Sequence, residues 1–291
     1  MKKDKPRTSA LQPSAFSPQP SSLPPPSKKL GQNFLVNEGV VKNIVDALAP
    51  ERNETIIEIG PGRGALTAQL VNRAERVVAV EFDRNLIPHL TDRFNGNRNL
   101  KLVPADALNV DFCLEIQPAD SARVVANLPY NVATAILQRL IAQRRCLTEM
   151  VLMLQREVVA RIIAPPDTKE RGYLSVFVQF YCETEKLFDV APGSFRPAPK
   201  VWSSVVRLVL RSRPAVTVQD EDLLWKLVSV GFAQRRKTIL NNMRSGPPDF
   251  EGLMKRHGGA SIVLCRAEVE LQRRAETLTL EEWARIVRAL E

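Results

Sequence analysis

Apolar runs and amphipathic segments alternate along the middle of the chain. Short apolar runs rich in β-branched residues are typical of buried strands, and such runs lie at residues 55–59, 76–81, 100–103, 123–126 and 148–154. Segments with helical spacing of apolar positions separate them, near residues 64–72, 84–94, 131–143 and 156–163. This alternation predicts an α/β, Rossmann-like fold, with a mostly parallel sheet and helices on both faces.

The pattern changes toward the C-terminus. Residues 203–210 form the last predicted strand, and residues 172–181 before it are an apolar-aromatic stretch that we expect in the core. After residue 213 only helices are indicated, at 221–232 and at 279–290, the second opened by a Thr279-x-x-Glu282 capping box. We therefore predict a small helical domain over residues 214–291.

The N-terminal part has a different composition. Residues 1–27 are rich in Pro and Ser and hold few bulky apolar residues, so we expect a disordered leader without a secretory signal. Residues 38–48 predict a helix that Asn37 caps, and its apolar face comprises Val41, Ile44, Val45 and Leu48. The α/β domain is thus expected to span residues 28–213.

Composition and charge narrow the function classes only partly. The 291 residues are 44% hydrophobic, which is ample for a large core. The net charge of +9 suggests a polyanionic partner, but residues 1–30 alone hold six basic residues and one acidic residue. No apolar run approaches the ~18 residues of a membrane span, so no membrane partner is expected. Local clusters must therefore identify the partner.

Cysteine and histidine usage indicates neither a metal site nor a disulfide framework. The chain has two histidines and four cysteines without a CxxC pair, namely Cys113, Cys146, Cys182 and Cys265. We expect no bound metal and a reducing, cytoplasmic environment.

A glycine-rich turn, EIGPGRGALT at residues 58–67, follows the first strand of the alternating region. Glycines at 60 and 62 let a ligand approach bare backbone and the positive end of a helix. Glu81 ends the next strand and can accept hydrogen bonds from ribose hydroxyls. These features indicate an adenosine-like cofactor, although Gly60-x-Gly62-x-x-Ala65 also fits a dinucleotide and a purely structural turn stays open. Asp106, after the third strand, either contacts an adenine edge or caps a helix.

The segment Asn127-Leu128-Pro129-Tyr130 follows another apolar strand, at the sheet edge where open α/β folds bind ligands. Asn127 offers both an acceptor and a donor, Pro129 stiffens the corner, and Tyr130 supplies a flat face. Such a group could hold an exocyclic amine and its ring. The alternative is an ordinary turn with Asn131 capping the next helix.

Three other segments are ambiguous when taken alone. The GQNFL segment at residues 31–35 is either a loop or part of a site. The proline-stiffened loop at residues 193–201 either displays Phe195 or buries it in the core. The basic residues Arg235, Arg236 and Lys237 form either a solvated face or a phosphate-binding cluster.

Taken together, these motifs resemble the small-subunit (16S-type) ribosomal RNA adenine N6,N6-dimethyltransferases, which use S-adenosylmethionine (SAM). The resemblance runs from about Lys29 to the C-terminus and leaves out the leader. It rests on six segments and Asp106: GQNFL at 31–35, EIGPGRGALT at 58–67, the acidic pair Glu81 and Asp83, NLPYN at 127–131, FRPAPKV at 195–201 and FAQRRKTILNN at 232–242.

The resemblance implies a role for each of these residues. The cofactor-binding residues would be Asn33, Leu35, Gly60, Gly62, Glu81, Asp106 and Asn127. The catalytic group would comprise Asn127, Leu128, Pro129, Tyr130 and Phe195, and the RNA-binding residues would be Arg235, Arg236 and Lys237. It further implies dimethylation of two adjacent adenosines near the 3′ end of small-subunit rRNA, in a pre-30S-like particle, by a monomer without metal.

The implied mechanism relies on positioning. The Asn127 side-chain oxygen and the Leu128 carbonyl would grip the adenine amine, while Tyr130 and Phe195 would stack on the extruded base. Positioning of this kind can lower a barrier by roughly 7–11 kcal/mol.

Three alternatives remain at this point. A large-subunit rRNA adenine methyltransferase of the macrolide-resistance type shares the N-terminal motifs, although the FRPAPKV and FAQRRKT segments favour the small-subunit group. An NAD(P) oxidoreductase would use the glycine fingerprint but leaves NLPY unexplained. A non-catalytic RNA-binding or assembly factor could keep the same fold.

Overall fold

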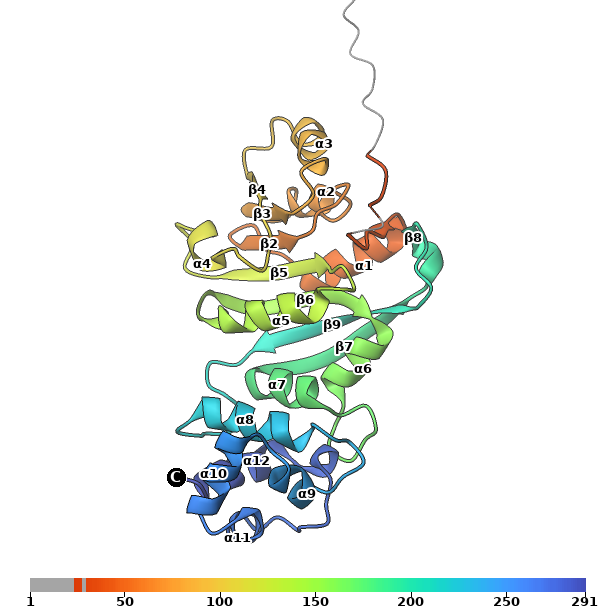
Figure 1. Ribbon diagram of the computed structural model, residues 1–291. Coiled ribbons are helices and arrows are strands. Elements are labelled where there is room, and N and C mark those ends of the chain that lie inside the picture. The colour runs from red at the N-terminus through yellow and green to blue at the C-terminus, as the bar shows by residue number, and fades with distance from the viewer. Residues whose placement is uncertain (1–23, 28–29) are drawn as a thin grey trace, which may run out of the picture.

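The computed structural model describes residues 24–27 and 30–291. Its centre is a seven-stranded sheet in the order β4-β3-β2-β5-β6-β9-β7 (Figure 1). The strands from β2 to β6 run parallel, and β9 is antiparallel to both of its neighbours. Their bounds are β2 (Thr55–Ile59), β3 (Arg76–Glu81), β4 (Leu100–Pro104), β5 (Ala122–Asn127), β6 (Leu147–Gln155), β7 (Cys182–Val190) and β9 (Ser203–Leu210).

Helices cover both faces of this sheet, as the alternation predicts. Successive side chains of a strand point to opposite faces, so Ile56 of β2 packs with α1 and α2 whereas Ile57 faces the core formed with α5, α6 and α7. The helix bounds are α1 (Glu38–Leu48), α2 (Thr67–Leu70), α3 (Leu86–Arg93), α4 (Phe112–Glu115), α5 (Ala133–Ala142), α6 (Arg156–Ile163) and α7 (Tyr173–Tyr181).

Most of the predicted elements are confirmed. All six predicted strands occur, with bounds that differ from the expectation by at most one residue. Helix α1 has its predicted bounds, its cap at Asn37 and its predicted buried face. Helix α2 is much shorter than expected because Gly62 and Gly64 have positive φ angles, so the chain turns before the helix begins at Thr67.

Two of the longer elements in the α/β region were not predicted. Residues 173–181, expected only as core, form helix α7, and β7 follows immediately. β7 is an edge strand whose exposed positions include Glu183, Glu185 and Lys186, so it lacks the apolar run that marks the central strands.

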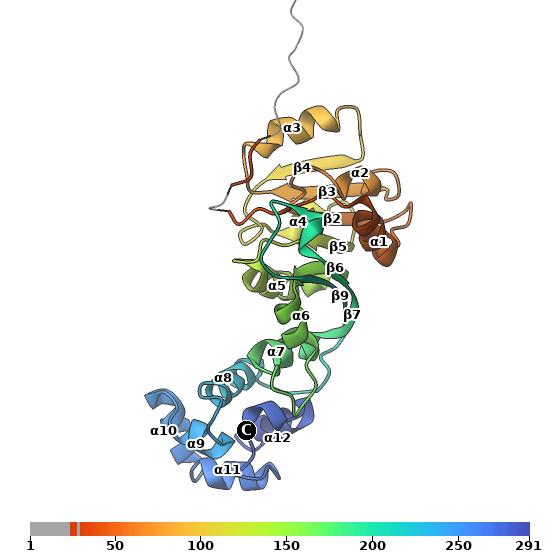
Figure 2. The same cartoon turned by 90° about the vertical axis from the view of Figure 1, so that its right-hand side faces the viewer.

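The C-terminal part is helical, as predicted, and lies beyond the β7 edge of the sheet (Figures 1 and 2). Its helices are α8 (Glu221–Gly231), α9 (Ile239–Arg244), α10 (Pro248–Arg256), α11 (Ala260–Arg266) and α12 (Leu280–Arg288). Leu224 and Trp283 belong to the same buried cluster as β5 and α7, so the core continues across residue 213. The domain boundary placed there stays a prediction.

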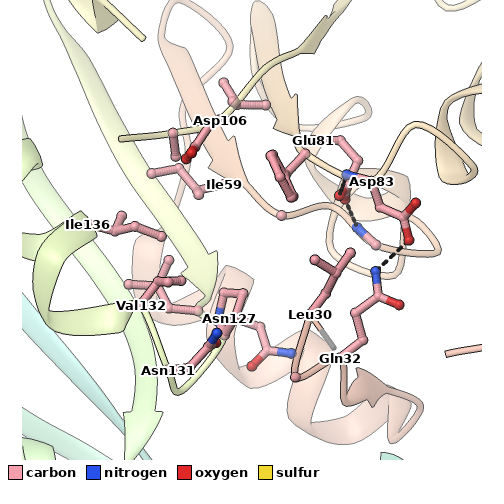
Figure 3. Close-up of a pocket in the computed structure, with 18 of the residues that line it drawn as sticks. Leu30, Gln32, Ile59, Glu81, Asp83, Asp106, Asn127, Asn131, Val132 and Ile136 are labelled. Carbon is pink, nitrogen blue, oxygen red and sulfur yellow. Dashed lines mark hydrogen bonds between the residues drawn. The ribbon is translucent and has the colours of Figure 1, made fainter. Parts of the chain in front are cut away.

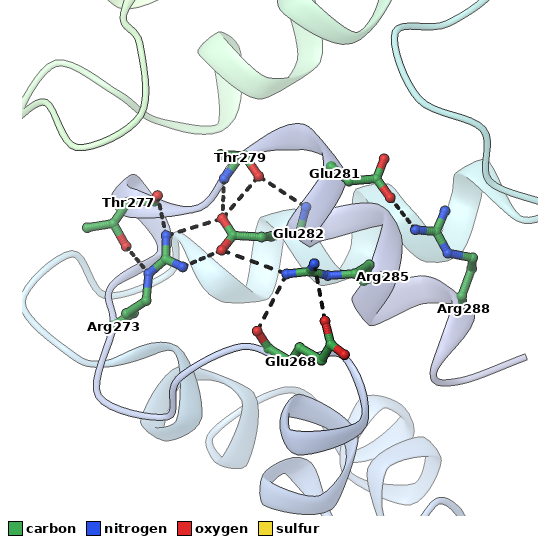
Figure 4. A network of polar contacts seen from close by, with 8 residues as sticks. All are labelled: Glu268, Arg273, Thr277, Thr279, Glu281, Glu282, Arg285 and Arg288. Atoms are coloured by element: carbon green, nitrogen blue, oxygen red, sulfur yellow. Dashed lines mark hydrogen bonds and ion pairs between the residues drawn. The ribbon is translucent and has the colours of Figure 1, made fainter.

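The predicted capping box at the start of α12 is confirmed. The Glu282 backbone N–H donates to the Thr279 hydroxyl at 3.2 Å, and the Thr279 N–H donates to the Glu282 carboxylate at 2.8 Å. Arg273 pairs with the same carboxylate, and Arg285 pairs with Glu268 at 3.5 Å (Figure 4). This network ties α12 to the segment that precedes it.

A two-stranded sheet of β1 (Phe34–Leu35) and β8 (Phe195–Arg196) and three short 3-10 helices complete the described elements. The 3-10 helices lie at Arg144–Cys146, Pro192–Ser194 and Ala275–Thr277. The first of them brings Cys146 next to Cys113 of α4, and the two form a disulfide with Cα atoms 5.5 Å apart. The two cysteines are 33 residues apart and form no CxxC motif, so the sequence did not indicate this disulfide. The expectation of reduced cysteines is wrong for these two residues. Cys182 and Cys265 are free.

The described residues contain no helix long and apolar enough to cross a membrane. The leader prediction falls mainly on residues 1–23, which lie outside the described residues.

Candidate cofactor and substrate site

A cavity of about 290 Å³ opens at the carboxyl ends of β2, β3, β4 and β5 (Figure 3). This edge of a parallel sheet is where α/β folds bind ligands. Most of the predicted site residues line the cavity, namely Asn33, Gly60, Gly62, Glu81, Asp106, Asn127, Leu128, Pro129 and Tyr130. Leu35 and Phe195 do not.

The glycine turn brings backbone to the cavity wall. Gly60 and Gly62 have φ angles of +67° and +58°, which residues with a Cβ rarely adopt. A Cβ on Gly62 would also lie 3.1 Å from the Phe34 ring. Because α2 begins only at Thr67, a ligand would meet the turn itself rather than the helix end that the sequence suggested.

Glu81 is a buried carboxylate with two fixed donors. It is 5% exposed, its Oε2 accepts the Gly62 N–H at 3.0 Å, and its Oε1 accepts the Asp83 N–H at 2.8 Å. Burial raises the pKa of Glu81, and these backbone donors oppose that shift. A carboxylate oxygen accepts more than one hydrogen bond, so Glu81 can still accept from hydroxyl groups in the cavity.

The segment from Leu30 to Phe34 forms the opposite wall. Gln32 donates from Nε2 to the Asp83 carboxylate at 2.8 Å, and its side-chain oxygen accepts the Ser27 N–H at 2.8 Å. The sequence motifs include both Gln32 and Asp83 but predicted a role for neither. The structure shows that they tie the N-terminal segment to the end of β3 (Figure 3).

Asn127 is the last residue of β5, and its amide orientation is fixed. Its Nδ2 donates to the Asn33 backbone carbonyl at 3.1 Å. The side-chain oxygen is therefore left as an acceptor, and none of the described residues donates to it. The next residue, Leu128, donates its N–H to the Met153 carbonyl at 3.2 Å, which holds the corner against β6.

Tyr130 and Asn131 complete this corner. The Tyr130 hydroxyl forms a hydrogen bond of 2.6 Å with Ser203 Oγ, and burial raises the pKa of Tyr130. Helix α5 begins at Ala133 without a side-chain cap, so the alternative in which Asn131 caps it is wrong. Asn131 lines the cavity instead.

Asp106 lies in the loop after β4 and faces the cavity (Figure 3). Its Oδ1 also accepts the Leu108 N–H at 2.9 Å, which closes a local turn. The alternative in which Asp106 caps a helix is wrong, because Asp111 caps the next helix, α4. The contact of Asp106 with an adenine edge stays a prediction.

Phe195 corrects the sequence-based account. Its side chain is fully buried, among Val41, Ile44 and their neighbours, because β8 (Phe195–Arg196) pairs with β1 (Phe34–Leu35). Phe195 therefore cannot offer a stacking face here, and the alternative in which it lies in the core is the one observed. Leu35, its pairing partner, packs in the same core.

The predicted RNA-binding residues do not line this cavity, because they lie between α8 and α9, beyond the β7 edge of the sheet. Arg235, Arg236 and Lys237, named here the basic cluster, are exposed on a turn between α8 and α9 and line a separate hollow. They precede α9, which begins at Ile239. Their contact with phosphate stays a prediction.

Comparisons with known proteins agree with the geometry. Residues 26–286 match the family model described as ribosomal RNA adenine dimethylase. Ribosomal RNA small subunit methyltransferase A of Geobacillus sp. (strain WCH70) is 41% identical over 268 residues, which cover 91% of each chain. The protein of that name from Saccharophagus degradans is 40% identical over 264 residues, 90% of this chain and 94% of its own.

Solved structures share the fold. A dimethyladenosine transferase from Plasmodium falciparum superposes with a TM-score of 0.74 at 23% identity, covering 87% of this chain and 95% of that one. The 23S rRNA methyltransferase ErmE gives a TM-score of 0.65 at 23% identity, covering 89% of this chain and 99% of its own. At this identity the two structures support the fold alone.

Proposed function

The chain belongs to the ribosomal RNA adenine dimethylase family, and we propose that it dimethylates N6 of two adjacent adenosines near the 3′ end of small-subunit rRNA. It is a SAM-dependent methyltransferase, which settles the cofactor question in favour of SAM over NAD. The finer parts of the proposal are a pre-30S-like particle as substrate, action as a monomer without metal, and a cytoplasmic location.

The residues of the cavity fit the cofactor. The Glu81 carboxylate, held by two backbone donors, is suited to ribose hydroxyls, and the bare backbone at Gly60 and Gly62 leaves room for the amino-acid end. Asp106 is placed for an adenine amine. When bound, SAM supplies an electrophilic methyl group on a sulfonium.

The observation that carries the proposal is the orientation of Asn127. The Asn127 Nδ2 donates to the Asn33 carbonyl. The Asn127 side-chain oxygen is therefore free to accept an amine hydrogen of the target adenine. The Leu128 carbonyl would accept the second amine hydrogen, and Pro129 keeps the corner stiff. Drawing both hydrogens toward acceptors directs the nitrogen lone pair out of the ring, so no strong base is required at the start. Tyr130 would stack on the base.

We assign substrate recognition beyond the target base to the helical region, residues 214–291, with the basic cluster contacting phosphates. The cluster is exposed and lies on a turn, which suits a contact with a polyanion.

The test is methyl transfer to defined ribosomal substrates. The full chain is incubated with labelled SAM and, separately, immature small subunits, naked small-subunit rRNA and large-subunit rRNA, and the nucleosides are analysed by mass spectrometry. We expect N6,N6-dimethyladenosine in the immature small subunits. Modification of large-subunit rRNA alone would favour the macrolide-resistance type, and no modification of any substrate would favour an assembly factor.

A further inference from the structure

The buried position of Phe195 leaves the loop at residues 193–201 without the stacking ring expected there. The residue that this loop does present, one position beyond it, is Trp202. Its side chain is 45% exposed, next to Val201 at 43%. Of the three tryptophans, Trp283 is fully buried and Trp225 packs against Tyr173, Phe177, Phe180 and Tyr181.

Trp202 lies at the substrate edge of the sheet. Its neighbour Ser203 starts β9, pairs with Gln155 at the carboxyl end of β6, and bonds the Tyr130 hydroxyl at 2.6 Å. Adjacent Cα atoms are about 3.8 Å apart. Trp202 therefore lies directly beside Ser203, the residue whose hydroxyl bonds Tyr130. Its backbone is also fixed, because its carbonyl accepts the Arg156 N–H at 2.9 Å.

Arg156 lies beside Trp202, and Lys200 is two residues before Trp202 in the chain. The Asp189 carboxylate is close enough to Arg156 for the two charges to attract each other. Arg156, Arg196 and Lys200 are exposed, and none of them forms a salt bridge within the described part of the chain. The Arg156 guanidinium stands over the Trp202 ring, but at 5.8 Å from its centre, against 4.4 Å for Arg63 over Phe34. The Arg156 guanidinium therefore lies near the Trp202 ring without packing closely against it.

We propose that Trp202, with Arg156 and Lys200, is a stacking platform for the nucleotide that flanks the target adenosine. An exposed aromatic ring beside unpaired cations is the combination that binds single-stranded nucleic acid without reading its sequence. The platform holds the strand next to the base that Tyr130 receives, and so contributes to substrate binding rather than to methyl transfer. This inference rests on the proposed function of the cavity.

Intrinsic fluorescence gives a readout that does not depend on catalysis. The full chain is titrated with a single-stranded RNA hexanucleotide containing two adjacent adenosines, in the presence of S-adenosylhomocysteine. Stacking on Trp202 should quench the emission of the parent protein, and Trp202→Phe should lose this quenching because Trp283 is fully buried and Trp225 is half-buried against other aromatic side chains. Quenching of the same size in Trp202→Phe would overturn the proposal.

Kinetics on immature small subunits provide the second measurement. Trp202→Ala should raise KM about tenfold, while kcat stays within about twofold and SAM affinity is unchanged. Trp202→Phe should restore most of the KM, since an aromatic face returns. The matched control is Leu114→Ala on α4, an apolar residue that is 60% exposed and lies outside the cavity. An unchanged KM in Trp202→Ala would overturn the platform while leaving the methyltransferase function intact, whereas a parent protein that methylates no rRNA would refute the proposed function itself.

Discussion

The carboxylate of Glu81 and the cations of the basic cluster differ in their burial and in their hydrogen bonding. Glu81 is 5% exposed, and each of its oxygens accepts a backbone N–H. Arg235, Arg236 and Lys237 are exposed on a turn. A buried group held by backbone is preorganised for one ligand and responds to pH through desolvation. Exposed cations respond to salt because ions in the solvent screen them, and of the three cluster residues Arg235 also donates to the Lys169 carbonyl. Cofactor and RNA recognition should therefore be separable by mutation and by solution conditions.

The largest effect is expected from Glu81→Ala. Removing the carboxylate deprives ribose hydroxyls of a charged acceptor and leaves the N–H groups of Gly62 and Asp83 without their partner. At about 1.5–3 kcal/mol for each hydrogen bond to a charged group, SAM affinity should fall roughly 10²–10⁴-fold, measured by calorimetric titration.

The affinity of the same variant for rRNA should remain that of the parent. Glu75→Ala is the matched control, because Glu75 is exposed just before the start of β3, at the other end of the strand. Normal SAM affinity in Glu81→Ala would show that the cavity does not hold the ribose.

The next effect concerns the buried carboxyl of Glu58, which lies on β2 and accepts the Thr67 hydroxyl at 2.6 Å. Burial raises its pKa from 4.5 to about 7. The folded state therefore keeps a proton that the unfolded state loses, so this contribution to stability is complete below pH 4.5 and is lost as pH rises to about 7. The free energy of unfolding should fall by up to about 3 kcal/mol across that window.

Denaturant titrations of the parent and of Glu58→Gln, repeated from pH 4.5 to pH 8, measure this effect. The amide variant does not titrate, so its stability should depend less on pH. Parallel curves for the two proteins would show that Glu58 is not the group responsible.

A smaller effect is expected from neutralising the basic cluster. Replacing Arg235, Arg236 and Lys237 by Ala should weaken rRNA binding and flatten its salt dependence, by about 0.7–0.9 in the logarithmic slope for each phosphate that the variant no longer neutralises. SAM affinity should not change. Binding is measured by filter retention of labelled small-subunit rRNA over a salt series.

The control for the cluster is the double variant Arg52→Ala/Arg98→Ala. Both residues are exposed in the loops before β2 and β4, at the sheet edge opposite the cavity. An equal decrease of slope for each charge removed in this control would mean that the cluster contributes only net charge.

Much of the fold could be predicted from the sequence because the central strands are buried on both faces. Their apolar runs are continuous, and the glycine turn, Glu81 and Asn127 follow directly from strand ends. β7 could not be predicted in the same way, since its charged residues alternate at an open edge. Cys113 and Cys146 meet only through the packing of α4 against the segment after α5.

The site was predicted less completely, for a physical reason. A motif states which residue types are present but not which side of a loop faces solvent. Phe195 and Trp202 lie seven positions apart in one segment, and only the pairing of β8 with β1 decides that the first is buried and the second exposed. The role of Gln32 likewise depends on a contact with Asp83, 51 residues away.

The central claim is that Asn127, which lines the same cavity as Glu81, contributes more to the transition state than to the binding of SAM or rRNA. The most direct measurement is single-turnover methylation of immature small subunits by Asn127→Ala, together with its affinities for SAM and for rRNA. Asn72→Ala serves as the control, because Asn72 is an exposed amide just after α2. We predict that the rate falls roughly 10²–10³-fold, as when one preorganised hydrogen bond to the reacting group is removed, while both affinities change less than about threefold. A parental rate, or a decrease in rRNA affinity as large as the decrease in rate, would contradict the account.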